Sequence, residues 1–150
     1  MKIFIDTSSL FKLYHKENGT DILEQFFRNN TVTTVFLTEI AKIEFASTVW
    51  KKVRTQEINE GESLTILKRF ETDFDKYTFI QIDSIITEQA RTLITKYGMQ
   101  GLRTLDSIQL STAVVLKNEC GIFISSDRLL NTFFENESLP IEIIHNQNRK

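Results

Sequence analysis

Short runs of apolar, β-branched or aromatic residues recur along the chain and predict the strands of one sheet. They are Lys2–Asp6, Thr31–Phe36, Thr78–Ile82, Gly121–Ser125 and Ile141–Ile144. The first, fourth and fifth runs are almost continuously apolar, which is typical of strands buried on both faces of a parallel sheet.

Longer segments with helical periodicity fill the gaps between these runs. They are Ser8–Tyr14, Thr20–Arg28, Thr38–Gln56, Ser63–Lys76, Ser84–Tyr97, Thr104–Glu119 and Arg128–Phe134. Thr38 is the expected N-cap of the third helix, Asn59–Gly61 the turn before the fourth, and Gly98 and Gly121 the glycines that follow helix C-termini. Strands that alternate with helices predict βαβ crossovers, so we expect an α/β fold with three layers, α/β/α, around a central, mostly parallel sheet of about five strands.

The length of 150 residues suits one domain, 1–150, with a substantial core. Hydrophobic residues make up 41% and charged residues 25%, as in ordinary soluble proteins, and a single proline argues against a long linker. The polar end, Asn146–Lys150, is expected to fray. His15 and His145 lie in polar contexts and resemble neither a catalytic base nor a ligand.

The lone cysteine, Cys120, cannot form an internal disulfide, and no Cys/His set has zinc spacing. The chain begins directly with a predicted strand instead of the charged and apolar regions of a signal peptide. No apolar stretch approaches the roughly 18 residues of a membrane helix. We therefore expect a cytoplasmic protein that does not enter a membrane.

The net charge of −2 argues against a simple nucleic-acid binder, because domains that hold duplexes by phosphate contacts are usually basic. A bound metal or a local basic patch can reverse the sign of the field at a site. The charge therefore predicts weak non-specific binding to nucleic acid without metal.

Four acids stand near the ends of predicted elements or on apolar helices: Asp6, Glu44, Asp106 and Asp127. Asp6 and Asp127 follow predicted strands, and the carboxyl ends of parallel strands meet at one edge of a sheet. Carboxylates in partly apolar surroundings resist ionisation unless a positive charge compensates them. The set therefore predicts a divalent cation and a metal-dependent nuclease.

Each acid also has a purely structural interpretation. Asp6 could cap the following helix, although Ser8 or Ser9 could do so equally well. No helical neighbour of Glu44 can form an ion pair with it, so it needs a tertiary partner, either a metal or a buried arginine. Asp106 could serve the helix dipole or pair with Arg103. Asp127 is a natural N-cap.

Four segments together resemble the PIN-domain ribonucleases, and more narrowly the VapC-type toxins of toxin–antitoxin pairs. Ile5–Tyr14 (IDTSSLFKLY) is similar to the family's D-T-S-x-L-x-K-L-Y start, and Thr38–Phe45 (TEIAKIEF) to the helix with its second acid. Leu102–Ala113 (LRTLDSIQLSTA) resembles L-R-x-x-D-a-x-x-L-A-x-A, and Phe123–Leu130 (FISSDRLL) resembles the ending strand-T-x-D-x-x-L. Two positions depart from the pattern, since Gln109 stands where the family often has His and Ser125 where Thr is common.

The resemblance implies a single PIN domain and an Mg²⁺-dependent endoribonuclease in which metal-activated water attacks the phosphodiester, with Mn²⁺ as a possible substitute. The four acids would be both catalytic residues and metal ligands, and Thr7 and Ser125 would orient them. Candidate RNA contacts are Lys12, Arg103 and Arg128. A homodimer and a small antitoxin protein are the implied partners.

Three alternatives stay open. The first is a PIN nuclease that acts in RNA processing or on structured nucleic acid without a toxin role. The second is a phosphoacceptor receiver module, for which Asp83 is the nearest candidate acceptor but which lacks the late strand ending in lysine. The third is a catalytically silent binding module that keeps the fold.

Overall fold

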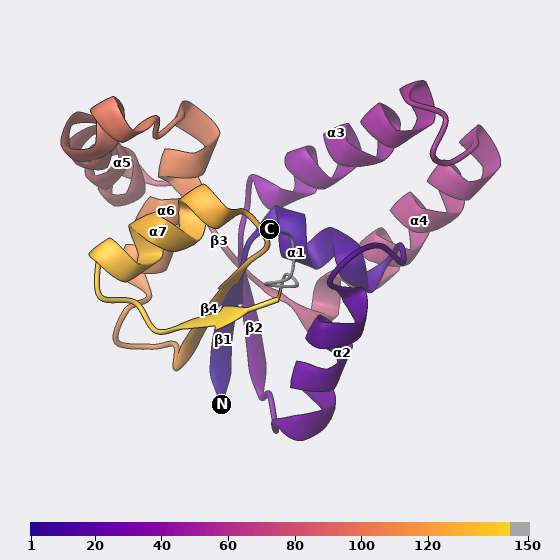
Figure 1. Cartoon of the computed structure of the whole chain (residues 1–150), viewed down its shortest axis with the longest axis horizontal. Helices are drawn as coiled ribbons and strands as arrows, with labels where there is room; N and C mark the ends of the chain where they lie inside the picture. The colour runs from indigo at the N-terminus through magenta and orange to yellow at the C-terminus, as the bar shows by residue number, and fades with distance from the viewer. Residues whose placement is uncertain (145–150) are drawn as a thin grey trace, which may run out of the picture.

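A five-stranded parallel sheet forms the centre of the structure, a computed structural model that describes residues 1–144 (Figure 1). Its strands are β1 (Lys2–Ile5), β2 (Thr34–Thr38), β3 (Thr78–Ile80), β4 (Ile122–Ser125) and β5 (Ile141–Ile143), in the order β3-β2-β1-β4-β5. Every neighbouring pair is parallel. His145 and the segment Asn146–Lys150 lie outside the described residues.

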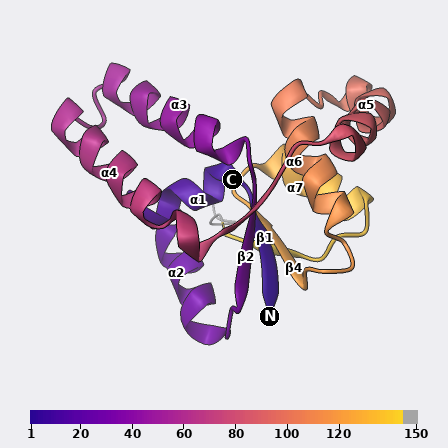
Figure 2. The ribbon, with the colours of Figure 1, turned by 180° about the vertical axis from the view of Figure 1, so that it is seen from behind.

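Helices cover both faces of this sheet, which confirms the predicted three-layer α/β/α fold (Figures 1 and 2). On one side lie α1 (Thr7–Leu10), α2 (Thr20–Asn29), α3 (Ala41–Arg54) and α4 (Glu60–Thr72). On the other lie α5 (Ser84–Tyr97), α6 (Thr104–Val115) and α7 (Arg128–Asn136). Short 3-10 turns follow α1, α4 and α5 at Phe11–Leu13, Phe74–Lys76 and Gly98–Gln100.

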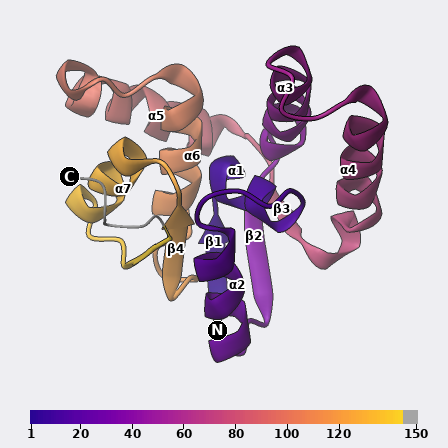
Figure 3. The same cartoon turned by 45° about the vertical axis from the view of Figure 1, so that its right-hand side comes forward.

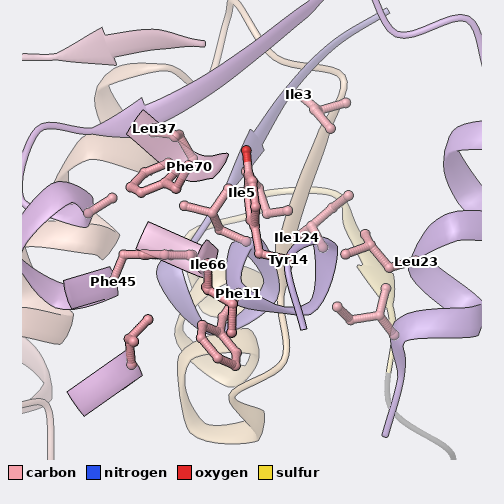
Figure 4. Close-up of a cluster of buried hydrophobic side chains, with 14 of the residues drawn as sticks. Ile3, Ile5, Phe11, Tyr14, Leu23, Leu37, Phe45, Ile66, Phe70 and Ile124 are labelled. Carbon is pink, nitrogen blue, oxygen red and sulfur yellow. The ribbon is translucent and has the colours of Figure 1, made fainter. Parts of the chain in front are cut away.

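Alternation along the strands divides the core into two clusters, because successive side chains of a strand point to opposite faces. Ile3, Ile5 and Ile124 pack on the face of α1 to α4, whereas Phe4 and Phe123 pack on the face of α5 to α7. All of these side chains are fully buried. Figure 4 shows the first cluster, with labelled side chains from the strands and helices: Ile3, Ile5, Leu37, Ile124, Phe11, Tyr14, Leu23, Phe45, Ile66 and Phe70.

Two helix starts differ from the sequence prediction. Thr38 is the buried last residue of β2 and not an N-cap, because β2 pairs with both β1 and β3 and extends to the register Thr38↔Ile80. The segment Asn59–Gly61 is not a separate turn. Asn59 caps α4 by accepting from the Glu62 amide at 2.8 Å, so that helix begins at Glu60.

Two helix ends also differ. Gly98 follows α5 as expected but has φ −56, and the left-handed residue is Gly101 at φ 92. The 3-10 turn between them postpones the reversal that glycine permits. Helix α6 ends at Val115 instead of Glu119, and the Gly121 amide donates to Lys2 at 2.9 Å, which aligns β4 with β1.

The strand order reverses direction between β1 and β4, which are neighbours although most of the chain separates them. The chain leaves β1 toward β2 and β3 and returns to the other side of β1 through α5 and α6. In open parallel sheets, ligands bind at such a switch point, outside the carboxyl ends of the strands. Figure 3 shows α1 at this end, with α3 and α6 rising on either side.

No helix in the described part of the chain is long and apolar enough to cross a membrane.

Candidate active site

A cleft of about 530 Å³ opens at the carboxyl ends of β1 and β4. All four acids predicted from the sequence line it, with Asp6 and Asp127 following the strands, Glu44 on α3 and Asp106 on α6. The fold therefore brings together side chains that are far apart in the sequence. A larger hollow of about 800 Å³ lies on α4 around Arg69, away from these acids.

Each of the four acids lies at the N-terminal end of a helix. Asp6 caps α1 by accepting from the Ser9 amide at 3.1 Å, and Asp127 caps α7 by accepting from the Leu130 amide at 3.0 Å. Glu44 and Asp106 lie in the first turns of α3 and α6. The partial positive charge of a helix N-terminus favours a nearby anion, which helps the fold to tolerate four clustered carboxylates.

Asp6 is almost completely buried and is held by hydroxyl and amide donors. The Ser125 hydroxyl donates to Oδ2 at 2.7 Å, and the Ser8 hydroxyl lies 2.9 and 2.8 Å from the two oxygens. The expectation that a serine could cap the helix and leave Asp6 redundant is wrong, because Asp6 is itself the cap. Burial raises the pKa of Asp6 to about 6, although the hydrogen bonds from Ser125, Ser8 and Ser9 oppose this rise.

Glu44 has two tertiary partners, and neither of them is an arginine. Its Oε1 atom accepts from Gln109 Nε2 at 2.7 Å and from the Thr7 hydroxyl at 3.1 Å. Burial raises the pKa of Glu44, the bonds from Gln109 and Thr7 oppose the rise, and the charge of Asp106 adds to it. The carboxylate is thus oriented by neutral donors without being neutralised.

Asp106 and Asp127 lie on the more accessible part of the cleft. Burial raises the pKa of Asp106, and repulsion from Asp127 raises it further, while Arg103 opposes the rise. Arg103 forms no ion pair with Asp106 within 4.0 Å in the described residues. The two acids therefore keep their carboxylates available to an external cation.

The donor set fits a divalent cation that keeps part of its water shell. Mg²⁺ and Mn²⁺ prefer oxygen ligands, and within residues 1–144 no ion pair reaches any of the four carboxylates. In the same residues, no three Asp, Glu, His or Cys side chains converge closely enough to surround an ion by themselves. Metal binding stays a prediction that the chemistry of the donors supports.

Of the three cations expected to contact RNA, two are exposed beside the cleft. Arg103 precedes α6 and Arg128 opens α7, and both are exposed next to acids of the cleft. Lys12 is instead buried, and its ammonium donates to Glu17 at 2.9 Å and to the Asn18 carbonyl at 2.7 Å. The Lys12 expectation is corrected, because this ammonium stabilises the loop before α2.

Two residues of the site were not selected from the sequence, Ser8 and Gln109. Ser8 looks like one of two interchangeable hydroxyls, and only the fold shows that it contacts both Asp6 oxygens. Gln109 follows Asp106 by three residues and so shares its helix face, which is a usable signal.

The receiver-module alternative loses its candidate phosphoacceptor, since Asp83 caps α5 by accepting from the Ile86 amide and does not line the cleft.

Replacement of Ser125 by alanine is expected to weaken Mn²⁺ binding by roughly 10- to 100-fold, the usual effect of losing a group that orients a metal ligand. The hydroxyl donates to Asp6 and accepts from the Asp127 amide at 3.0 Å, so its loss loosens two acids at once. Calorimetric titration with Mn²⁺ measures the change. Ser125→Thr, which keeps the hydroxyl, is the matched control, and equal affinities of Ser125→Ala and the wild type would contradict the role.

Comparison with known proteins adds an independent line of evidence. A model of the PIN domain family matches residues 3–132. A search of curated proteins found no match.

Several solved structures share the fold. FitAcB from Neisseria gonorrhoeae is 13% identical with a TM-score of 0.69, and the match covers 96% of this chain and 96% of that chain. VapBC2 from Rickettsia felis, bound to a DNA fragment from its promoter, is 17% identical with a TM-score of 0.63 and coverages of 95% and 98%. VapC20 from Mycobacterium tuberculosis, a toxin that cleaves the sarcin–ricin loop, is 12% identical with a TM-score of 0.65 and coverages of 87% and 93%.

Proposed function

Since the chain belongs to the PIN domain family, we propose that it is a metal-dependent endoribonuclease that hydrolyses phosphodiester bonds of RNA. The observation that carries the proposal is the cleft itself. Four carboxylates line it, no cation of the described residues pairs with them, and burial raises the pKa of three of them. Such a set is costly to keep unless it binds something positive.

We assign the four carboxylates to the binding of Mg²⁺, with Mn²⁺ as a substitute. Hydrogen bonds within the fold hold the side chains of the site: Ser125 and Ser8 donate to Asp6, and Thr7 donates to Glu44. A bound cation would act as a Lewis acid: it would neutralise charge on the attacked phosphate and lower the pKa of a water nucleophile. Arg103 and Arg128 are the proposed contacts to flanking phosphates.

The proposal is tested by incubating labelled RNAs and DNAs with the protein in Mg²⁺, Mn²⁺ or EDTA. An Asp6→Asn/Asp106→Asn variant serves as the control for contaminating nucleases. RNA cleavage that needs metal and is lost in the variant supports the proposal. A wild type that binds Mn²⁺ but cleaves no RNA or DNA contradicts it and favours a silent binding module, whereas cleavage of structured DNA favours the alternative PIN nuclease.

We further propose that the protein is the toxin of a VapBC-type pair and acts in the cytoplasm on RNA. VapBC2 and the toxin VapC20 share its fold over most of the chain, which supports this narrower assignment. Induction of the wild-type gene should arrest growth, and induction of the Asp6→Asn variant should not. Growth unaffected by the active enzyme would count against a toxin.

The proposed partners are a small antitoxin protein and a second copy of the chain. The resemblance in sequence supports both, and exposed apolar side chains such as Met99 and Ile85 offer contact surface. Light scattering over a concentration series tests the homodimer, and a 17.5 kDa monomer at every concentration would rule it out. Co-expression with the product of the adjacent gene tests the antitoxin by rescue of growth.

A further inference from the structure

Gln109 connects the three segments that form one wall of the cleft. Its side chain is on α6 and only 2% exposed. The Nε2 atom donates to Glu44 Oε1 on α3 at 2.7 Å and to Thr7 Oγ1 on α1 at 3.1 Å. Thr7 also donates to the same Glu44 oxygen, so the three side chains form a closed triangle of hydrogen bonds.

The orientation of the amide follows from the chemistry of Glu44. Glu44 Oε1 accepts the hydrogen bonds from Gln109 and Thr7, so the amide nitrogen of Gln109 faces the carboxyl group and the amide oxygen points elsewhere. That oxygen, Oε1, is buried and has no partner among the described residues. A buried acceptor without a partner destabilises a fold, and an apolar side chain of the same size would avoid this cost.

We propose that Gln109 is a positioning residue that holds the Glu44 side chain directed into the cleft for a divalent cation, at a cost to the stability of the fold. This inference rests on the proposed function, since it assigns Glu44 to the cation. A purely structural role predicts the opposite pattern of effects on stability and on metal binding. If Gln109 served the core, its replacement by an apolar residue of similar size would alter stability and leave metal binding unchanged.

The decisive variant is Gln109→Met, which keeps the length of the side chain and removes both the donor and the unpaired acceptor. Titration calorimetry with Mn²⁺ alone should show affinity about tenfold weaker than in the wild type. Thermal unfolding of the metal-free variant should occur at the wild-type temperature or above it. Affinity within twofold of the wild type would overturn the inference.

A second variant keeps the inference testable if the first does not fold. Gln109→His retains an N–H donor of similar reach and should bind Mn²⁺ within about threefold of the wild type. Loss of affinity in a folded Gln109→His protein would overturn the inference. The matched control is Ser111→Ala, which removes another buried bond of α6, from the Ser111 hydroxyl to the Ile86 carbonyl at 2.8 Å, away from the cleft. It should lower stability without changing Mn²⁺ affinity.

Metal titration separates this inference from the proposed function. A wild type that binds Mn²⁺ but cleaves nothing would refute the nuclease and leave the role of Gln109 intact if Gln109→Met binds weakly. A wild type that cleaves RNA, together with a Gln109→Met variant of equal affinity, would refute only the role of Gln109. A wild type that binds no Mn²⁺ would refute both.

Discussion

An Asp6→Asn variant is expected to lose RNA cleavage by at least about a thousandfold and yet, without metal at pH 8, to unfold at a higher temperature than the wild type. The loss of activity follows because Asp6 lines the cleft and is the most deeply buried of the four acids. Removal of one preorganised charged group from a catalytic site typically costs a factor of about 100 to 1,000, and loss of a metal ligand costs at least as much. Asparagine can still cap α1, so the local fold should persist.

The gain in stability follows from the pKa of Asp6, which rises from 3.8 to about 6 on folding. The folded protein holds this proton more tightly than the unfolded chain. Below about pH 4 the carboxyl group is protonated in both states, and Asp6 does not lower the free energy of unfolding. The destabilisation by ionised Asp6 grows as the pH rises from about 4 to about 6 and then levels off at about 3 kcal/mol. This figure is an upper limit for the variant, since asparagine loses part of the bonding to Ser8 and Ser125.

Urea unfolding in EDTA at pH 4 and pH 8 measures this difference directly. The two proteins should be nearly equally stable at pH 4, and the variant should be more stable at pH 8. If the four acids bind the metal as proposed, saturating Mn²⁺ should reverse the order at pH 8, because only the wild type retains all four and binding stabilises the folded state. A difference in stability between the two proteins that does not change with pH would show that burial does not destabilise the ionised form of Asp6.

A Phe45→Ala variant is expected to lose about 3–5 kcal/mol of folding free energy. Phe45 follows Glu44 on α3, is completely buried, and lies between three aromatic rings. The centroid distances are 4.2 Å to Phe70, 5.4 Å to Tyr14 and 5.5 Å to Phe11. The cavity left by its removal would loosen the packing of α3 against α4 and against Phe11 and Tyr14, which follow α1. The loss is a large part of the roughly 5–15 kcal/mol that holds a typical domain together.

The control for this variant is Ile43→Ala, two positions away on the same helix. The Ile43 side chain is 72% exposed, so its truncation should change the free energy of unfolding by less than about 0.5 kcal/mol. Urea unfolding followed by circular dichroism gives both values. Similar losses for the two variants would mean that α3 does not pack against the aromatic cluster as described. At 25 °C Phe45→Ala should also bind Mn²⁺ more weakly, because α3 positions Glu44.

The sequence was sufficient to predict that the four acids lie together but not the contacts among them. Asp6 and Asp127 follow strands whose apolar runs are unmistakable, and one rule about parallel sheets places both at the same edge. Glu44 was correctly predicted to need a tertiary partner. The spacing from Asp106 places Gln109 on the same face of α6, but its contact with Glu44 depends on how α6 is rotated against α3, and no local pattern encodes that rotation.

The errors in element boundaries share a physical cause. Thr38 has the chemistry of an N-cap, and tertiary pairing with Ile80 makes it part of a strand instead. Gly61 is a turn-former by propensity and lies inside α4 because Asn59 caps the helix first. Lys12 is a candidate RNA contact from the resemblance, and its burial beside Glu17 depends on a loop conformation that is absent from any short window of sequence.

The position of β4 has a consequence for the synthesis of the protein. Among the strands of residues 1–144, β4 is the fourth to leave the ribosome and the only one that pairs with the second edge of β1, through the register Ile3↔Ile122 to Ile5↔Ile124. Until residue 125 has emerged, a nascent chain has an open strand edge, lacks Ser125 to hold Asp6, and has no Asp127. A nuclease of this fold therefore lacks part of its four-acid site until β4 and Asp127 have been synthesised and have left the ribosome.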